Sequence, residues 1–181
     1  MFTCYKYDEA GNELAQIDAL NRTNIYAYDS QGRRIRHALP GGQVEGAAFD
    51  LGGNLVYQTN FNGRVITNQY DELNRLTNQI SVNGDQARYV YDPATGQRVR
   101  MTDGSGVTAY GYDRRDRLVL KTVNWNQGPG VSLNYGYDAN GNVMNLWSST
   151  ASGVNLAYRY DPLNRLTVAT VISKRCAIMS I

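Results

Sequence analysis

Tyr70-Asp71-Glu72-Leu73-Asn74-Arg75-Leu76-Thr77 decides the fold, because the stretch returns almost unchanged as Tyr160-Asp161-Pro162-Leu163-Asn164-Arg165-Leu166-Thr167. Weaker copies, each starting with an aromatic residue followed by Asp, fill the chain. They begin at Tyr7, Tyr28, Phe49, Tyr70, Tyr91, Tyr112, Tyr137 and Tyr160. The first five intervals are 21 residues, and the last two are 25 and 23 residues. So constant a period indicates a repeat protein. A single repeat cannot bury its own apolar face, and stacking of neighbouring repeats buries it.

One repeat, residues 89–110, shows how the unit is built. Tyr89-Val90-Tyr91 alternates as a strand does, and Asp92-Pro93-Ala94-Thr95-Gly96 consists of turn residues. Residues 97–102 alternate again, and Asp103-Gly104-Ser105-Gly106 marks a second turn. Each repeat therefore predicts two antiparallel strands and two turns, and no window of the sequence shows the period of a helix.

Each turn that follows an aromatic-Asp pair should contain one residue with a left-handed backbone. The residue at that place is always Gly, Asn or Asp, the types that tolerate this conformation. These residues are Gly11, Gly32, Gly53, Asn74, Asp116, Gly141 and Asn164. A second series of turns is marked by Gly42, Gly63 and Gly84 at the same 21-residue step, two of them in Asn-Gly pairs that favour hairpins.

The predicted fold class is all-β, a meander of about fourteen to sixteen antiparallel strands in hairpin repeats that form a curved open sheet. We expect residues 1–167 to form the repeat array as a single domain and residues 168–181 to be an atypical C-terminal tail. Tyr-x-Tyr, present in six of the eight repeats, predicts a ladder of cross-strand aromatic contacts. The apolar tail predicts an exposed, aggregation-prone edge, and unpaired outer strands predict self-association.

Composition and charge exclude several classes of function. The formal net charge of +2 is too small to favour nucleic acid as a partner. No apolar run approaches the roughly 20 residues of a membrane span. Met1-Phe2-Thr3-Cys4 leads directly into the first repeat, so we expect no signal peptide and a chain that begins within an array. Two cysteines, Cys4 and Cys176, set no disulfide framework, and the sequence assigns no localisation.

The phrase Tyr-x-Tyr-Asp-x-x-Gly/Asn-Arg/Asn-Leu resembles the YD repeat of the RHS-repeat family, and the resemblance covers residues 5–167. Related arrays occur in the C components of bacterial insecticidal toxin complexes and in the teneurins. The resemblance implies hairpins that spiral into a hollow β shell, of which this array would be a segment of wall. It also implies partners: an enclosed toxin or effector polypeptide, or further repeats of a longer chain. Members of the family are typically secreted or delivered at the cell surface.

The sequence departs from the full pattern of a toxin shell. Shells of that type release their cargo by cleaving themselves at a motif with closely spaced Asp-Pro steps. In this chain the Asp-Pro steps are Asp92-Pro93 and Asp161-Pro162, and both open ordinary turns. We therefore expect a wall segment that encloses and scaffolds without cleaving itself.

The residues that could carry chemistry predict no catalytic, cofactor or metal site. Turn-opening Asp residues bond their own backbone, which explains them without acid–base catalysis or a calcium loop. His37 is the one histidine and cannot form a multi-His metal site. Cys4 and Cys176 lack metal spacing, and no helix follows the turn glycines to hold a phosphate. The chain is therefore not expected to be an enzyme.

An alternative function rests on aromatic residues outside the Tyr-x-Tyr pattern. Trp125, Trp147 and Tyr57 could stack on sugar rings, with Asn and Arg side chains at their edges. These three are the candidate binding residues of a cell-surface carbohydrate-binding or adhesion module, for which glycans would be the partners. Trp125 is the best single candidate, because it lies at the tip of the loop predicted for residues 125–130.

Overall fold

The computed structural model describes residues 2–172, and these consist of strands and turns without a helix. The first eight strands are β1 (Cys4–Tyr7), β2 (Glu13–Ile17), β3 (Thr23–Tyr28), β4 (Arg34–Ala38), β5 (Val44–Phe49), β6 (Leu55–Thr59), β7 (Val65–Tyr70) and β8 (Leu76–Ser81). The other eight are β9 (Gln86–Tyr91), β10 (Arg98–Asp103), β11 (Gly106–Tyr112), β12 (Leu118–Trp125), β13 (Val131–Tyr137), β14 (Val143–Ser148), β15 (Asn155–Tyr160) and β16 (Leu166–Val171). No helix in this part of the chain could cross a membrane.

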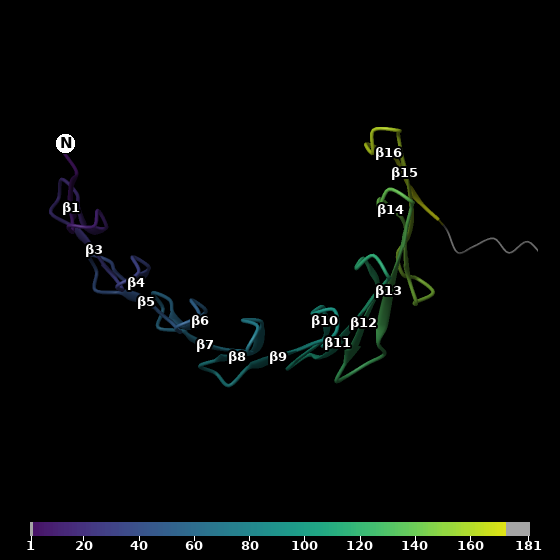
Figure 1. Ribbon diagram of the computed structural model, residues 1–181, viewed down its shortest axis with the longest axis horizontal. Coiled ribbons are helices and arrows are strands. Elements are labelled where there is room, and N and C mark those ends of the chain that lie inside the picture. The colour runs from purple at the N-terminus through teal and green to yellow at the C-terminus, as the bar shows by residue number, and fades with distance from the viewer. Residues whose placement is uncertain (1, 173–181) are drawn as a thin grey trace, which may run out of the picture. The chain divides into compact units, whose positions relative to one another are not determined.

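The strands form one open antiparallel sheet whose order is the order of the sequence, from β1 to β16. This meander confirms the predicted all-β class and the expected number of strands. Two compact units divide the chain, unit 1 at Met1–Arg88 and unit 2 at Tyr89–Ile181. Within each unit every hairpin lies beside the next one along the chain (Figure 1).

A β-bulge recurs at the same place in seven hairpins. The register shifts between the repeat aromatic and the residue before it, as between Gln69 and Tyr70 and between Gly136 and Tyr137. The same shift occurs at Tyr7, Tyr28, Phe49, Tyr112 and Tyr160. A bulge increases local twist and re-aims the side chains beside it. These seven repeat aromatics are therefore set into their hairpins in the same way.

The left-handed turn residues lie where the sequence predicts them. Gly11, Gly32, Gly53, Asn74, Asp116, Gly141 and Asn164 all have φ between 59° and 95°. The second turn series contains one member that the sequence analysis missed: Asp18-Ala19-Leu20-Asn21-Arg22 carries Asn21 at φ 61° and no glycine. Its signal was the same Asp-x-x-Asn-Arg pattern that marks the first series.

The fold has almost no interior. Among residues 2–172, Ala15 and Ala38 are the buried apolar side chains, with Asn68, Thr108 and Ser148 as buried polar ones. The folded state is therefore stabilised by sheet hydrogen bonds and by contacts between neighbouring hairpins, and not by a hydrophobic core as in a globular domain.

β16 includes the first residues that the sequence analysis assigned to a tail. Leu166–Val171 pairs with β15, so Val168 to Val171 extend the last hairpin. Val168 and Val171 are 44% and 75% exposed. Residues 173–181, with Cys176, lie outside the described residues, and the aggregation-prone tail edge stays a prediction for them.

Candidate functional site: the contacts that join successive repeats

Each repeat begins its first turn with an Asp whose carboxylate holds the turn closed. In the repeat quoted first, Asp71 Oδ1 accepts the backbone N–H groups of Leu73 (3.0 Å) and Arg75 (2.9 Å). Backbone bonds complete the turn, because Asp71 N–H donates to Arg75 O and Asn74 N–H donates to Asp71 O. The carboxylate therefore satisfies the backbone groups that the chain reversal leaves unpaired.

The second carboxylate oxygen binds the side chain four residues later. Asp71 Oδ2 accepts a hydrogen bond from Arg75 Nε at 2.7 Å, and Asp138 Oδ2 accepts one from Asn142 Nδ2 at 2.8 Å. The backbone N–H of Arg75 contributes most to lowering the pKa of Asp71. For Asp138, the side chain of Asn142 contributes most to the lowered pKa. These acids stay ionised at neutral pH, which opposes a role as general acid.

The hydroxyl groups of four repeat tyrosines tie their hairpins to the preceding hairpin. Tyr70 donates to the carbonyl oxygen of Leu55 (3.0 Å), and Tyr137 donates to that of Leu118 (2.7 Å). Tyr112 and Tyr160 make the same bond to Arg98 O and Val143 O. Each acceptor lies at the start of the second strand of the preceding repeat. The tyrosine thus supplies a partner for a carbonyl at the junction of two hairpins.

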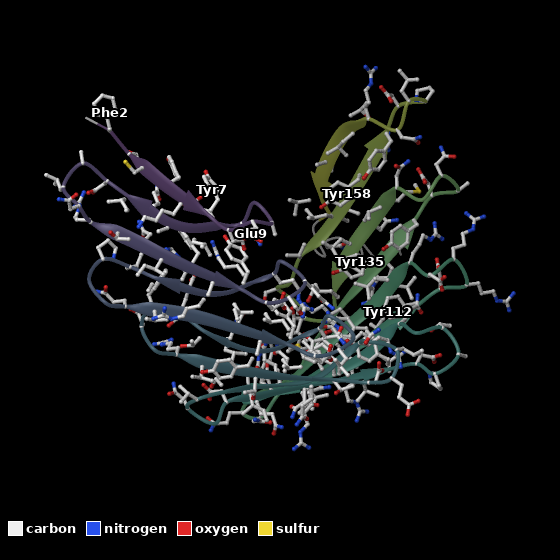
Figure 2. All side chains as sticks on the ribbon, turned by 60° about the vertical axis from the view of Figure 1, so that its left-hand side comes forward. Phe2, Tyr7, Glu9, Tyr112, Tyr135 and Tyr158 are labelled. Atoms are coloured by element: carbon white, nitrogen blue, oxygen red, sulfur yellow. The ribbon has the colours of Figure 1, made fainter. Side chains whose placement is uncertain are left out.

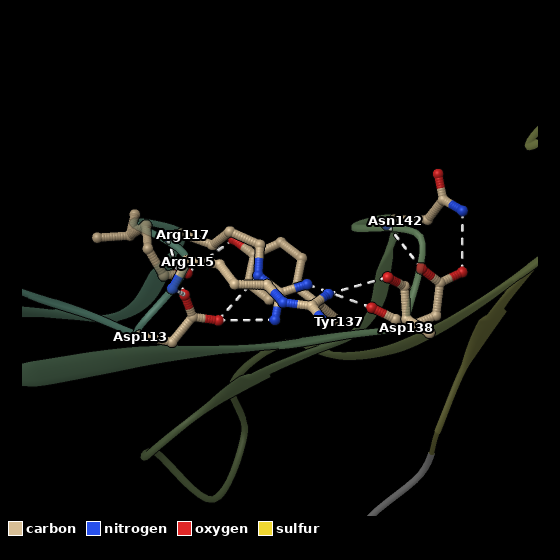
Figure 3. A network of polar contacts seen from close by, with 8 residues as sticks. Asp113, Arg115, Arg117, Tyr137, Asp138 and Asn142 are labelled. Atoms are coloured by element: carbon tan, nitrogen blue, oxygen red, sulfur yellow. Dashed lines mark hydrogen bonds and ion pairs between the residues drawn. The ribbon is translucent and has the colours of Figure 1, made fainter.

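Arginine side chains make the reverse connection, from one turn to the next repeat (Figure 3). The Arg117 guanidinium binds Asp113 through Nε (2.8 Å) and lies 4.6 Å from the ring centroid of Tyr137. Its Nη1 donates to Asp138 O at 3.2 Å, while Arg115 Nη1 donates to Ala139 O at 3.0 Å. Arg33 lies over Phe49 at 4.3 Å in the same way. A cation–π contact thus joins each of these turns to the next aromatic.

The predicted ladder of tyrosine rings needs correction at these junctions. The register places the Tyr-x-Tyr residues on one face of each unit, the tyrosine face, and Tyr112, Tyr135 and Tyr158 carry it along unit 2 (Figure 2). Rings of successive repeats are two strands apart, about 9–10 Å, so side chains of the intervening strand come between them. Arg98, for example, lies 5.6 Å from the ring of Tyr89 and 4.9 Å from that of Tyr110.

The three aromatic candidates for sugar binding do not form one surface. Tyr57 pairs with Ala48 and Trp147 pairs with Asn134, so both lie opposite the tyrosine face of their units. Trp125 does not lie at a loop tip as predicted: it pairs with Gly106 at the end of β12, on the tyrosine face of unit 2. Their exposures are 38% for Tyr57, 44% for Trp125 and 40% for Trp147. Each is accessible separately.

His37 is held in a polar and aromatic setting within unit 1. Its Nδ1 lies 3.2 Å from Glu45 Oε1 and its Nε2 lies 3.3 Å from Asn24 Oδ1. The ring stacks on Tyr26 at 4.5 Å and meets Phe61 edge-on at 5.1 Å. In residues 2–172, no three His, Cys, Asp or Glu side chains are grouped as a metal ion would require.

Comparison with known proteins identifies the family to which these repeats belong. A family model described as RHS Repeat matches residues 7–44, 70–108 and 137–172, together more than half of the chain. The chain belongs to the RHS repeat family. The turns, bulges and tyrosine bonds described above are therefore the structural form of RHS repeats in this protein.

Solved structures show the same fold. One is the Photorhabdus luminescens Tc holotoxin pore with a mutated TccC3, and another is TcdB2-TccC3 without its hypervariable C-terminal region. Each matches with a TM-score of 0.72 and 19% identity, over 93% of this chain and 10% of the other. TcdB2-TccC3 matches at 0.71 with the same identity and coverage. This chain thus spans about a tenth of the length of those chains, and the likeness establishes the fold alone.

Proposed function

We propose that this chain is a non-catalytic segment of an RHS shell wall, which encloses and scaffolds a toxin or effector polypeptide. The observation that carries the proposal is the uniform junction between repeats. At six of the seven junctions, the residue three positions before the aromatic pairs with the residue seven positions after the preceding turn Asp, as in Ile25–Ala15, Thr67–Tyr57 and Ala157–Asn145. Before Tyr112 the partner lies one residue later, because the turn that Asp92 opens is one residue longer. A junction repeated in one register builds a continuous wall.

The outer strands support packing against further repeats. Tyr7 is 58% exposed, whereas its equivalents Tyr137 and Tyr160 are half-buried and bond the preceding hairpin. The Arg165 side chain is 73% exposed, against 27% for Arg33 and 26% for Arg117, which lie over the next aromatic ring. The outer residues thus have the groups that join hairpins elsewhere in the array.

The turn carboxylates support a role without catalysis. Each turn Asp that could have acted in acid–base chemistry binds backbone N–H groups of its own turn, for example Asp8, Asp50 and Asp113. Their lowered pKa values suit structural carboxylates rather than proton donors.

Protection from protease tests the proposal. This segment would be expressed together with the repeats and the polypeptide encoded next to it, and digestion of that polypeptide would be followed over time. We expect the polypeptide to resist digestion until the wall is unfolded by denaturant. Flanking DNA without further repeats, or digestion as fast as that of the free polypeptide, would count against the wall role.

A second candidate function is glycan binding through the exposed aromatics. The observation in its favour is Trp125, 44% exposed at the end of β12 beside Asn126. A glycan array with the intact chain and with Trp125→Ala tests it, and Trp147→Ala and Tyr57→Ala test the other two candidates. Binding that Trp125→Ala reduces at least tenfold would support this function, and an array without signal would remove it.

A further inference from the structure

One position of the tyrosine face is empty where other repeats carry a ring. The residue two positions before the repeat aromatic is Tyr in six repeats, but it is Ala47 in the third repeat and Asn68 in the fourth. Asn68 is 9% exposed, donates to Leu55 O and accepts from Gln79, so polar contacts occupy its place. Ala47 has only a methyl group there. In the second repeat, the equivalent Tyr26 stacks on its cross-strand partner His37.

A groove of about 590 Å³ lies at this position, within unit 1. Its floor includes a single cross-strand row, because Ala47 pairs with Gln58, Gln58 with Ile66, and Ile66 with Ser81. Ala47 is two residues before Phe49 on β5, so both side chains lie on the same face of the sheet. The row therefore lies on the tyrosine face. The volume falls within the range of about 300–1,000 Å³ that is usual for ligand sites.

The walls of the groove combine aromatic and polar groups. Phe49 and His37 line the groove together with Ala47, so two aromatic rings border it. At the other end of the floor, Ser81 Oγ is buried and has no hydrogen-bond partner among the described residues.

The charged residues around the groove favour a neutral ligand. Glu45 is already bound by Arg34 at 3.3 Å and by His37 at 3.2 Å. Arg36, Arg64 and Asp85 also line the groove, so charges of both signs surround it. The groove therefore offers ring contacts and hydrogen bonds without a strong preference for either charge.

We propose that this groove binds a tyrosine-containing segment of another polypeptide. The tyrosine ring occupies the place over Ala47 and Gln58 that the array's own tyrosines occupy in other repeats. The adjacent residues extend along the floor toward Ser81. The repeat pattern itself defines this occupant, since the site is built to border a phenol ring and lacks one. The proposal does not depend on the wall role.

A short peptide and two alanine positions test this site. The probe is acetyl-Gly-Ser-Tyr-Ser-Gly-amide, titrated into the 181-residue chain and followed by NMR chemical shifts and calorimetry. Ala47→Tyr supplies the missing ring from the chain itself and should weaken binding at least tenfold. Ala48→Tyr is the matched control, because it adds the same ring to the same strand on the opposite face, and it should leave binding unchanged.

Two further measurements keep the test decisive. A peptide with leucine in place of tyrosine should bind at least fivefold more weakly to the intact chain. If Ala47→Tyr does not fold, Gln58→Arg takes its place in the test. It fills the floor of the groove from the neighbouring strand and should also weaken binding. The absence of saturable binding, or equal loss in Ala47→Tyr and Ala48→Tyr, would overturn the proposal.

Discussion

At the scale of single residues, the turns depend on a few positions with a left-handed backbone. Gly84 has φ 84° and nothing within 4 Å of where a Cβ would stand, so Gly84→Ala tests backbone strain without a clash. We expect a loss of about 1 kcal/mol in the free energy of unfolding, measured by urea denaturation. Gly104 is equally open but lacks a positive φ, so Gly104→Ala should change stability by less than about 0.5 kcal/mol. Equal effects of the two variants would contradict this explanation.

The sequence predicts these residues well, because turn chemistry is local. An Asp that bonds the backbone two and four residues later, followed by Gly or Asn, is visible as a pattern of four or five letters. The same pattern at Asp18 to Arg22 lies in the second turn series, where glycine marks the other turns, so a search for glycine does not find it. The sequence shows that Ala47 stands where six other repeats have tyrosine. Only the structure shows that a groove remains at this position.

At the scale of the strand and hairpin, the repeat tyrosine acts through its hydroxyl group. Tyr137 donates to Leu118 O in the preceding hairpin, so Tyr137→Phe should reduce the free energy of unfolding by about 0.5–1.5 kcal/mol. Tyr135 lies on the same strand and face, and within residues 2–172 its hydroxyl group makes no hydrogen bond. Tyr135→Phe is therefore the matched control and should be nearly neutral in thermal and urea unfolding. A similar loss in both variants would show that the hydroxyl bond is not the cause.

Contacts between hairpins are harder to read from the sequence than the hairpins themselves. Alternation predicts that Tyr135 and Tyr137 share a face, and the structure agrees. It does not predict that an arginine from the preceding turn lies over the ring, as Arg117 does. That contact depends on the bulge beside the aromatic and on the spacing of strands, which no short window of sequence contains.

At the scale of the whole molecule, stability comes from a sum of similar junctions. With few side chains buried, no single substitution should abolish folding, and each junction should contribute its own increment. The turn carboxylates are the most numerous shared element. Their effect should therefore appear as a collective property of the chain, namely its dependence on pH.

Acid should destabilise the protein more steeply than a single carboxylate could. The pKa values of at least eight turn Asp residues are lowered in the folded state: Asp8, Asp18, Asp29, Asp50, Asp71, Asp113, Asp138 and Asp161. The unfolded chain takes up protons near the ordinary Asp pKa of about 4, and the folded chain only at lower pH. Stability is thus fully present above about pH 5 and falls as the pH drops through the lowered values.

Thermal unfolding followed by circular dichroism between pH 7 and pH 2 measures this effect. Asn60 already replaces Asp in one turn, where its Oδ1 accepts the N–H groups of Asn62 and Arg64 at 3.0 Å each. A variant with Asp29→Asn, Asp71→Asn and Asp113→Asn should therefore fold, with a lower melting temperature at pH 7, since three Asp–Arg ion pairs are lost. Its melting temperature should fall less steeply with acid, because three of the shifted carboxyl groups no longer titrate. If the two proteins show the same slope, the turn carboxylates do not cause the pH dependence.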